Sequence, residues 1–103
     1  MTNHTKEEKM IIIAGHSRAK TTAERDANVA AFADMVKRAR MQDGCIDFAI
    51  SADAADPERS NILEIWRDEQ AWKAWRKIAK APGVKRGITE VSVYRSEKAE
   101  KPF

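Results

Sequence analysis

The chain has 103 residues, of which 34% are charged, and its formal net charge is +3. This length fits one small domain. Positive and negative side chains are mixed along it, whereas a nucleic-acid-binding surface concentrates positive charge. The longest apolar run is far shorter than the ~18 residues needed to cross a bilayer. The polar residues 1–9 lack the apolar segment of a secretory leader. We therefore expect a cytoplasmic protein with no nucleic-acid or membrane partner.

The first half of the chain predicts a strand followed by a helix. Residues 10–17 include three consecutive β-branched residues, Ile11 to Ile13, which is typical of a buried strand. Residues 21–44 predict a helix, because Thr21 and Glu24 have the spacing of a capping box and Gly44 is a stop signal. Its expected apolar stripe consists of Val29, Phe32, Ala33, Val36 and Ala39.

The second half predicts three more strands and one helix. The strands are expected at residues 45–51, 61–67 and 87–96, and the helix at residues 69–81, with Asp68 as its cap. Alternation in the first of these strands places Ile46, Phe48 and Ile50 on one face. The inner side of the helix is expected to hold Ala71, Trp72, Trp75, Ile78 and Ala79. Residues 1–9 and 97–103 are expected to be flexible tails around a domain of residues 10–96.

This order of elements predicts an α+β, ferredoxin-like βαββαβ fold, with a four-stranded antiparallel sheet and both helices on one face. The opposite face would then lack a cover. We expect it to carry Leu63, Ile65, Val91 and Val93. An exposed apolar patch of that kind usually marks an interface, so the pattern favours a homodimer in which two sheets face each other.

Five short segments, in order, carry a resemblance to a known family. They are "MIIIAG", "DGCIDFAIS", "DPER", "LEIW" and "RDEQAWKAW". Together they resemble the antibiotic biosynthesis monooxygenase domain of the dimeric α+β barrel proteins, over roughly residues 10 to 95. The resemblance implies a homodimer of facing sheets. It also implies oxygenation of a small molecule in many members and haem degradation in some.

The resemblance also suggests which aromatic residues could line a pocket. Trp66 matches the strand-end tryptophan that lines the pocket of family members, although plain core packing would also explain a buried indole. Trp72 falls where oxygenase members can carry a pocket aromatic, and a core role suits it equally. Glu64 shares the strand face of Trp66, so its carboxylate is either poised in a pocket or, as we favour, held in a structural ion pair.

A few polar residues are also candidates for the functional site. His16 ends the first strand and could accept a proton from a phenol, or it could be a half-exposed structural residue. Asn61 and Arg86 resemble, in approximate register, polar residues that polarise substrate or oxygen in quinone-forming relatives, and solvation at the surface is the alternative that we favour. Cys45, the only cysteine, is expected to be a small buried thiol rather than a nucleophile.

Haem chemistry is disfavoured by one departure from the family. Trp75 stands where many members have histidine, and residues 68–81 contain no histidine that could serve as an axial ligand. Clustered metal ligands and a glycine-rich phosphate loop are also missing from the sequence, so we expect no cofactor.

Our leading hypothesis is a cofactor-independent monooxygenase in which a small aromatic substrate, an electron-rich phenol or hydroquinone, reacts with molecular oxygen. The alternative is a non-catalytic small-molecule-binding or stress-related dimer. In the first case we expect Trp66 to border a cavity across from His16. Trp75 and Ile78 would then lie deepest in the core, and Trp72 would bridge the two regions.

Overall fold

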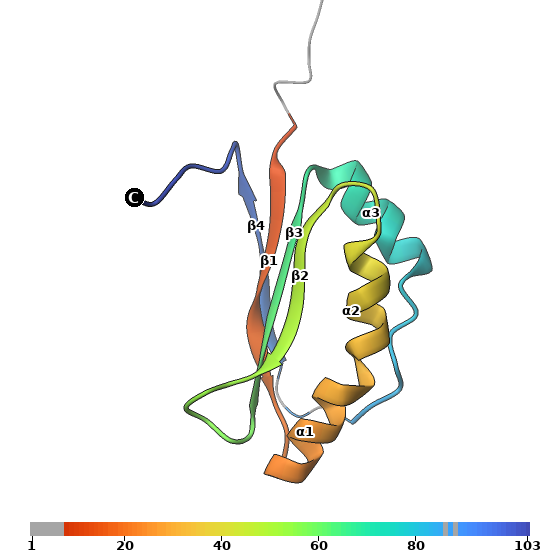
Figure 1. Cartoon of the computed structure of the whole chain (residues 1–103), viewed down its shortest axis with the longest axis vertical. Helices are drawn as coiled ribbons and strands as arrows, with labels where there is room; N and C mark the ends of the chain where they lie inside the picture. The colour runs from red at the N-terminus through yellow and green to blue at the C-terminus, as the bar shows by residue number, and fades with distance from the viewer. Residues whose placement is uncertain (1–7, 86, 88) are drawn as a thin grey trace, which may run out of the picture.

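Four antiparallel strands and three helices form two layers in the computed structural model, which describes residues 8–85, 87 and 89–103. The strands are β1 (Met10–Arg18), β2 (Cys45–Ala52), β3 (Arg59–Trp66) and β4 (Thr89–Ser96). The helices are α1 (Thr22–Ala31), α2 (Ala33–Arg40) and α3 (Glu69–Ile78). The sheet order is β2-β3-β1-β4, and all helices lie on the same side of it (Figure 1). The predicted α+β, ferredoxin-like βαββαβ architecture is confirmed.

The first predicted helix is present as α1 and α2, which meet at Phe32. The Thr21 side chain caps α1 by accepting a hydrogen bond from the Glu24 N–H at 3.0 Å. The Glu24 carboxylate accepts from the N–H of Lys20 instead of Thr21, so half of the predicted capping box forms. At the junction the Phe32 N–H is shared between the carbonyls of Asn28 and Val29. This sharing tightens the turn and divides the helix.

Helix α3 begins where it was predicted and ends early. The Asp68 carboxylate caps it by accepting a hydrogen bond from the Ala71 N–H at 2.9 Å. Lys80 adopts φ = 50°, a left-handed conformation that cannot continue a helix. Ala71 and Trp75, one turn apart, face the sheet and are buried. Ile78 is 50% exposed, so the prediction that it lies deep in the core is wrong.

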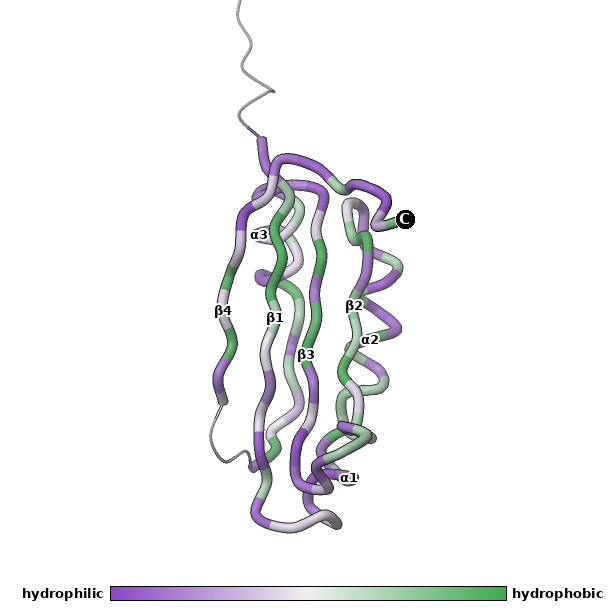
Figure 2. Tube along the Cα trace, turned by 90° about the vertical axis from the view of Figure 1, so that its left-hand side faces the viewer, coloured by the Kyte–Doolittle hydropathy of each residue, from purple (hydrophilic) through white to green (hydrophobic). Residues whose placement is uncertain are grey.

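Strand pairing decides which residues share a face, because directly opposed residues of antiparallel strands lie on the same side. Figure 2 shows the face without helices, here called the open face. Leu63 and Ile65 lie on it, as predicted, opposite Ala14 and Ile12 of β1.

Strand β4 does not follow the prediction. Its Val93 pairs with Ile13 and its Val91 with Gly15, on the side of the helices. The prediction that these two valines lie on the open face is wrong, because Tyr94 takes that position opposite Ile12. A Cβ on Gly15 would approach the Glu90 carbonyl oxygen to 2.0 Å, so the close pairing of β1 and β4 requires glycine here.

An irregularity in β2 changes a second expectation. The register between β2 and β3 shifts between Cys45 and Asp47, which is typical of a β-bulge. Ile46 therefore does not share the inner face with Phe48 and is 55% exposed. In helices α1 and α2 the inner stripe also differs, since Met35 is buried and Ala33 is exposed.

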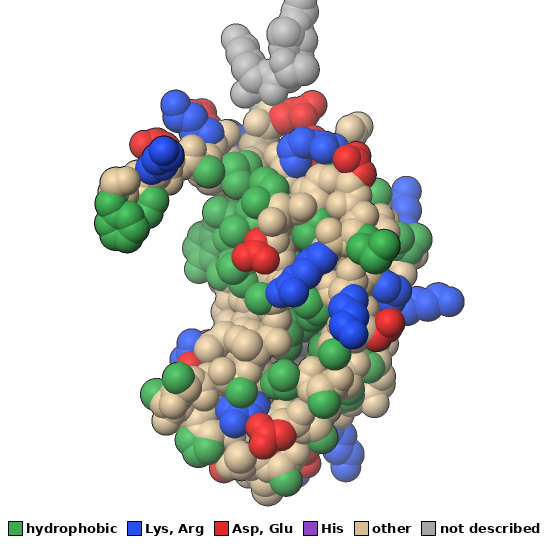
Figure 3. Space-filling model, in the orientation of Figure 1, with side chains coloured by type: hydrophobic (Ala, Val, Ile, Leu, Met, Phe, Trp, Pro, Cys, Tyr) green, Lys and Arg blue, Asp and Glu red, His purple; other side chains and the backbone are tan. Residues whose placement is uncertain are grey.

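The open face is divided into an apolar and a polar half. In Figure 2 the upper halves of β1 and β3 are mainly hydrophobic and the lower halves mainly hydrophilic. Figure 3 shows hydrophobic side chains gathered on the upper part of this side, near the C-terminal segment. Residues 97–103 of that segment form no helix or strand. The upper half of the open face consequently presents an apolar surface that no element of the chain's own two layers covers.

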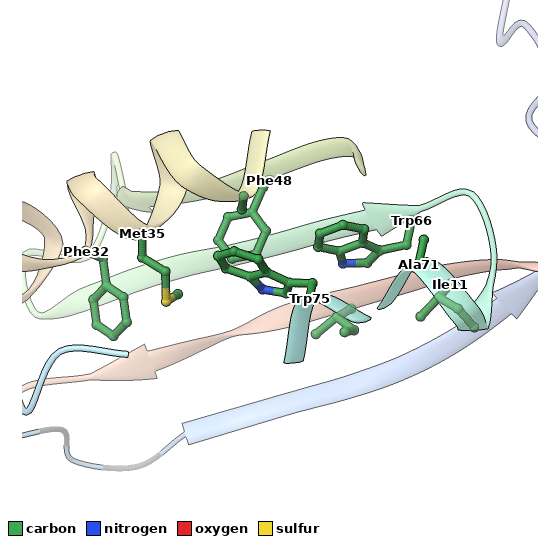
Figure 4. Close-up of a cluster of buried hydrophobic side chains, with 9 residues drawn as sticks. Ile11, Phe32, Met35, Phe48, Trp66, Ala71 and Trp75 are labelled. Atoms are coloured by element: carbon green, nitrogen blue, oxygen red, sulfur yellow. The ribbon is translucent and has the colours of Figure 1, made fainter. Parts of the chain in front are cut away.

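Three aromatic rings form the centre of the core (Figure 4). Trp66 of β3 stacks on Trp75 of α3, with ring centroids 6.1 Å apart. Phe48 of β2 meets both indoles edge-on, at 6.4 Å and 5.8 Å. Trp66 is 0% and Trp75 3% exposed. The expectation that Trp66 borders a cavity is therefore wrong, because it is the most completely buried of the three tryptophans.

We predict that Trp66→Ala lowers the free energy of unfolding by about 3–5 kcal/mol, because it removes a fully buried indole and leaves a cavity. Trp72→Ala should cost less, since Trp72 is only partly buried. Urea unfolding of the two variants, followed by circular dichroism, measures the difference. Equal losses would contradict this account of the core.

Candidate functional site

A groove of about 630 Å³ runs between α3 and the β1–β4 half of the sheet. Ile13, Glu64 and Val93 form its floor, on three adjacent strands. Trp72, Trp75 and Arg76 of α3 form one wall, and Lys80 lies at the rim. The groove exists because α3 packs over β1 and β3, so that the inner face of the edge strand β4 stays uncovered. Most of this lining is apolar or aromatic, which suits a small organic ligand.

Glu64 is the acidic residue of this lining. Its Oε1 accepts a hydrogen bond from the indole Nε1–H of Trp66 at 3.0 Å. Burial raises the pKa of the Glu64 carboxyl above its ordinary value of 4.5, and the Trp66 hydrogen bond and the charge of Arg76 only partly oppose this effect. No salt bridge to Glu64 is found within residues 8–85 and 89–103. The predicted structural ion pair is thus absent from the described part of the chain.

The indole wall is flanked by two guanidinium groups. The Cζ of Arg76 lies 5.1 Å from the ring centroid of Trp72. The Cζ of Arg38 lies 5.7 Å from that of Trp75. Both distances are those of cation–π contacts. Trp72 is partly buried and lines the groove. Trp75, expected only in the core, contributes to the groove as well.

His16 lies on the open face and is separated from the groove by the sheet. Its Nε2 is 3.3 Å from Oε1 of Glu90. The partner of Trp66 on β1 is Ile11, whereas His16 pairs with Asn61. The expectation that His16 faces Trp66 is therefore wrong. His16 is also the only histidine among the described residues, so none of these residues offers an imidazole to the groove.

Asn61 takes part in a local network at the polar end of the open face. Its Nδ2 donates to Oδ1 of Asp53 at 2.9 Å, and its Oδ1 accepts from Nε of Arg59 at 2.8 Å. The hydrogen bonds from Asn61 and from the backbone N–H groups of Asp56 and Ala55 lower the pKa of Asp53 to about 2. This network holds the β2–β3 connection together and lies away from the groove.

Two other candidates can be placed only in part. Arg86 falls outside the described residues. Cys45 is half-buried, and burial together with the nearby carboxylates of Asp47 and Glu64 raises the pKa of its thiol. The thiolate is the nucleophilic form, so this environment favours the expected inert thiol. The described residues contain no group of three or more His, Cys, Asp or Glu side chains able to hold a metal ion.

Sequence reasoning missed Arg76 and Lys80 of the groove lining. For Arg76 the signal was available, because it follows Trp72 by four residues, and such residues share one side of a helix. Lys80 lies beyond the end of α3, where helical spacing does not apply. Val93 was also missed, because the strand alternation had been assigned to the wrong side of the sheet.

A second hollow, of about 410 Å³, lies at the N-terminal end of α3 and is lined partly by Asp68, Glu69 and Arg95. These side chains are already engaged. Asp68 caps the helix. The Glu69 carboxylate forms salt bridges with Arg95 at 3.2 Å and with Lys73 at 3.3 Å. We therefore regard the groove beneath α3 as the candidate site.

The structure is a ferredoxin-like α+β domain with a groove between its sheet and its last helix. The profile of the antibiotic biosynthesis monooxygenase family matches residues 10–82. The chain belongs to that family. No significant match to a curated protein is found. Each helix in the described residues falls short of the length and apolar character needed to cross a bilayer.

Solved structures share the fold at low sequence identity. A protein from Chloroflexus aurantiacus J-10-fl, provisionally described as an antibiotic biosynthesis monooxygenase, is 22% identical, with 89% of this chain and 97% of that chain covered and a TM-score of 0.68. A Shewanella oneidensis protein is 18% identical, with coverages of 87% and 93% and a TM-score of 0.68. A Mycobacterium tuberculosis protein is 19% identical, with coverages of 92% and 99% and a TM-score of 0.66.

We predict that Glu64 titrates above 4.5, its ordinary value. The folded state then holds a proton that the unfolded chain has released. The free energy of unfolding should accordingly fall as pH rises from 4.5 through the raised pKa. The indole N–H signal of Trp66 in an NMR titration should report the same midpoint, because this N–H donates to Glu64.

The control for this titration is Glu69, whose pKa is lowered by the hydrogen bonds from Arg95 and Lys73. Glu64→Gln should abolish the titration of the Trp66 signal and flatten the fall in stability, whereas Glu69→Gln should leave both unchanged. A Trp66 signal that titrates at or below 4.5 would contradict the assigned environment.

Proposed function

We propose that this protein is a cofactor-independent monooxygenase that oxidises an electron-rich phenol or hydroquinone with molecular oxygen. The observation that carries the proposal is the Glu64 carboxylate. It is partly buried on the floor of a groove with indole walls, in an environment that raises its pKa. Membership of the antibiotic biosynthesis monooxygenase family supports the reaction type.

The reaction is balanced without an external reductant when the para carbon of the phenol carries a hydrogen. Glu64 accepts the phenol proton, and the phenolate passes one electron to oxygen, giving a phenoxyl radical and superoxide. These combine at the para carbon and take up a proton to form a hydroperoxide. The para C–H proton then leaves as the O–O bond breaks. The products are a quinone and water, each containing one atom of the oxygen molecule, and the ring supplies all four electrons.

The protein has two tasks in this scheme. The first is proton transfer, for which a carboxylate with a raised pKa is a stronger base than an ordinary one. The second is to hold the ring flat and keep water away from the radical pair. The partly buried Trp72 offers aromatic surface for this purpose, and Ile13 and Val93 close the apolar floor. His16 has no part in this scheme, because it lies on the other face of the sheet.

We predict that a panel of dihydroxynaphthalenes that carry a hydrogen on the carbon para to a hydroxyl, such as the 1,5 isomer, includes a substrate whose quinone formation is matched by oxygen uptake in a one-to-one ratio, without release of hydrogen peroxide. Glu64→Gln should lower kcat/KM by about 100-fold or more, the usual contribution of a general base. An oxygen electrode combined with quinone absorbance measures both quantities.

The matched control is His16→Gln, which removes the other candidate base and should leave kcat/KM within about twofold. Oxygen uptake that is lost in His16→Gln and kept in Glu64→Gln would place the chemistry on the open face. Tight binding of the aromatics without oxygen uptake would favour the non-catalytic binding protein.

We further propose that the open face pairs with a second copy of the chain, giving the homodimer that the family resemblance implies. Ile12, Leu63 and Ile65 lie together on it, and Tyr94 beside them is 55% exposed. A stable dimer of this kind buries about 1,200–2,000 Å² or more in total. Two facing sheets offer the broad apolar surface needed for this area.

We predict that light scattering at micromolar concentration gives twice the mass of the chain. Leu63→Lys should convert the protein to a monomer, because it places an unpaired charge in the apolar interface. Ile78→Lys is the control, because Ile78 is an exposed apolar residue of α3 and this change should leave the dimer intact. A wild-type monomer would refute this assembly.

A further inference from the structure

The rim of the groove carries an arginine that has no acceptor in the described protein. Of the eight arginines in the described residues, seven donate a hydrogen bond to a carboxylate or carbonyl oxygen, namely Arg18, Arg25, Arg38, Arg40, Arg59, Arg67 and Arg95. Arg76 is the exception. Its guanidinium lies over the Trp72 ring and makes no hydrogen bond or salt bridge to any described residue.

Lys80 adds a second cation at the same rim. Its side chain makes no ion pair with the described residues. The left-handed turn of its backbone is held by a hydrogen bond from Arg38 to its carbonyl oxygen. The C-terminal end of a helix carries partial negative charge, so the backbone of α3 does not attract anions here. Arg38 is nearby, but its guanidinium is paired with Asp34. Among the residues that line the groove, Arg76 and Lys80 are the cations that can attract an anion.

The acidic residue of the lining lies on the floor rather than at the rim. An ionised Glu64 on β3 repels a second carboxylate, whereas Arg76 and Lys80 attract one. An arginine fork is suited to a bidentate contact with a carboxylate. The groove therefore has a polarity along its depth, with a proton acceptor at the bottom, indole surface between, and positive charge at the entrance.

We propose that the ligand of this groove is an aromatic acid. Its flat phenolic ring rests against Trp72, its hydroxyl points to Glu64, and its carboxylate binds Arg76 and Lys80. The orientation of the hydroxyl toward Glu64 rests on the proposed function. The preference for a ligand that carries a carboxylate can be measured by binding alone, without turnover.

The test is isothermal titration calorimetry on the full chain with 6-hydroxy-2-naphthoate and the uncharged 6-hydroxy-2-naphthamide. At low salt and pH 7.5 the acid should bind about tenfold or more tightly than the amide, as expected for a charge-assisted contact. The preference should shrink when salt is raised, because screening weakens exposed charges. Equal affinity for the two probes, or no binding of either, would overturn the proposal.

Variants locate the contact. Arg76→Gln should remove most of the preference for the acid while leaving the affinity for the amide unchanged. Arg76→Lys should keep part of the preference for the acid, because lysine carries the positive charge but lacks the planar guanidinium that can bind both carboxylate oxygens. Lys77→Gln is the control, because Lys77 is an exposed residue of α3 outside the groove lining. A preference that survives Arg76→Gln, with folding verified by circular dichroism, would place the anion elsewhere.

The two proposals can fail separately. Selective binding of the acid without oxygen uptake would support the anion site and refute the monooxygenase. Oxygen uptake with uncharged phenols, together with equal affinity for the two naphthalene probes, would support the monooxygenase and refute the anion site.

Discussion

The stacked contact between Trp66 and Trp75 is the interaction on which the other features of this protein depend. It joins the end of β3 to the middle of α3, and Phe48 extends the contact to β2. A buried indole N–H needs an acceptor, and Glu64, two residues earlier on the same face, provides it. The carboxylate is therefore kept near the core by the packing of a tryptophan. The raised pKa of the Glu64 carboxyl follows from this position near the core, which an ordinary requirement of the core imposes.

The two faces of the sheet meet different environments, because successive side chains of each strand point to opposite faces. Along β3, Ile62, Glu64 and Trp66 face the helices, whereas Asn61, Leu63 and Ile65 face the open side. Neighbouring residues of one short strand thus belong to a ligand groove and to a proposed protein interface. A substitution on one face leaves the other face's side chains in place, and for this reason Glu64 and Leu63 can be altered independently.

The order of the elements and most of their boundaries could be predicted from the sequence, because periodicity and capping are local properties. Thr21 and Asp68 cap the helices as expected. The expectation that Val91 and Val93 share one face of β4 was also correct. The alternation of side chains along a strand does not determine which of the two groups of side chains faces the helices, however. That choice depends on pairing with β1, a contact between residues ~80 apart along the chain. The same gap in local information placed His16 opposite Trp66, whereas strand pairing places it opposite Asn61.

Among the described strands β4 pairs with β1 alone, and its residues are almost all exposed. An edge strand with so little cover contributes the least stable hydrogen bonds of a sheet, and such segments open first in local unfolding. Glu90 and Arg95 give this strand charges that discourage pairing with a foreign edge. Because Val93 forms part of the groove floor, fraying of β4 would change the shape of the groove while the aromatic core stays intact. The edge of the sheet therefore bears on the shape of the groove, whereas its centre carries the aromatic core.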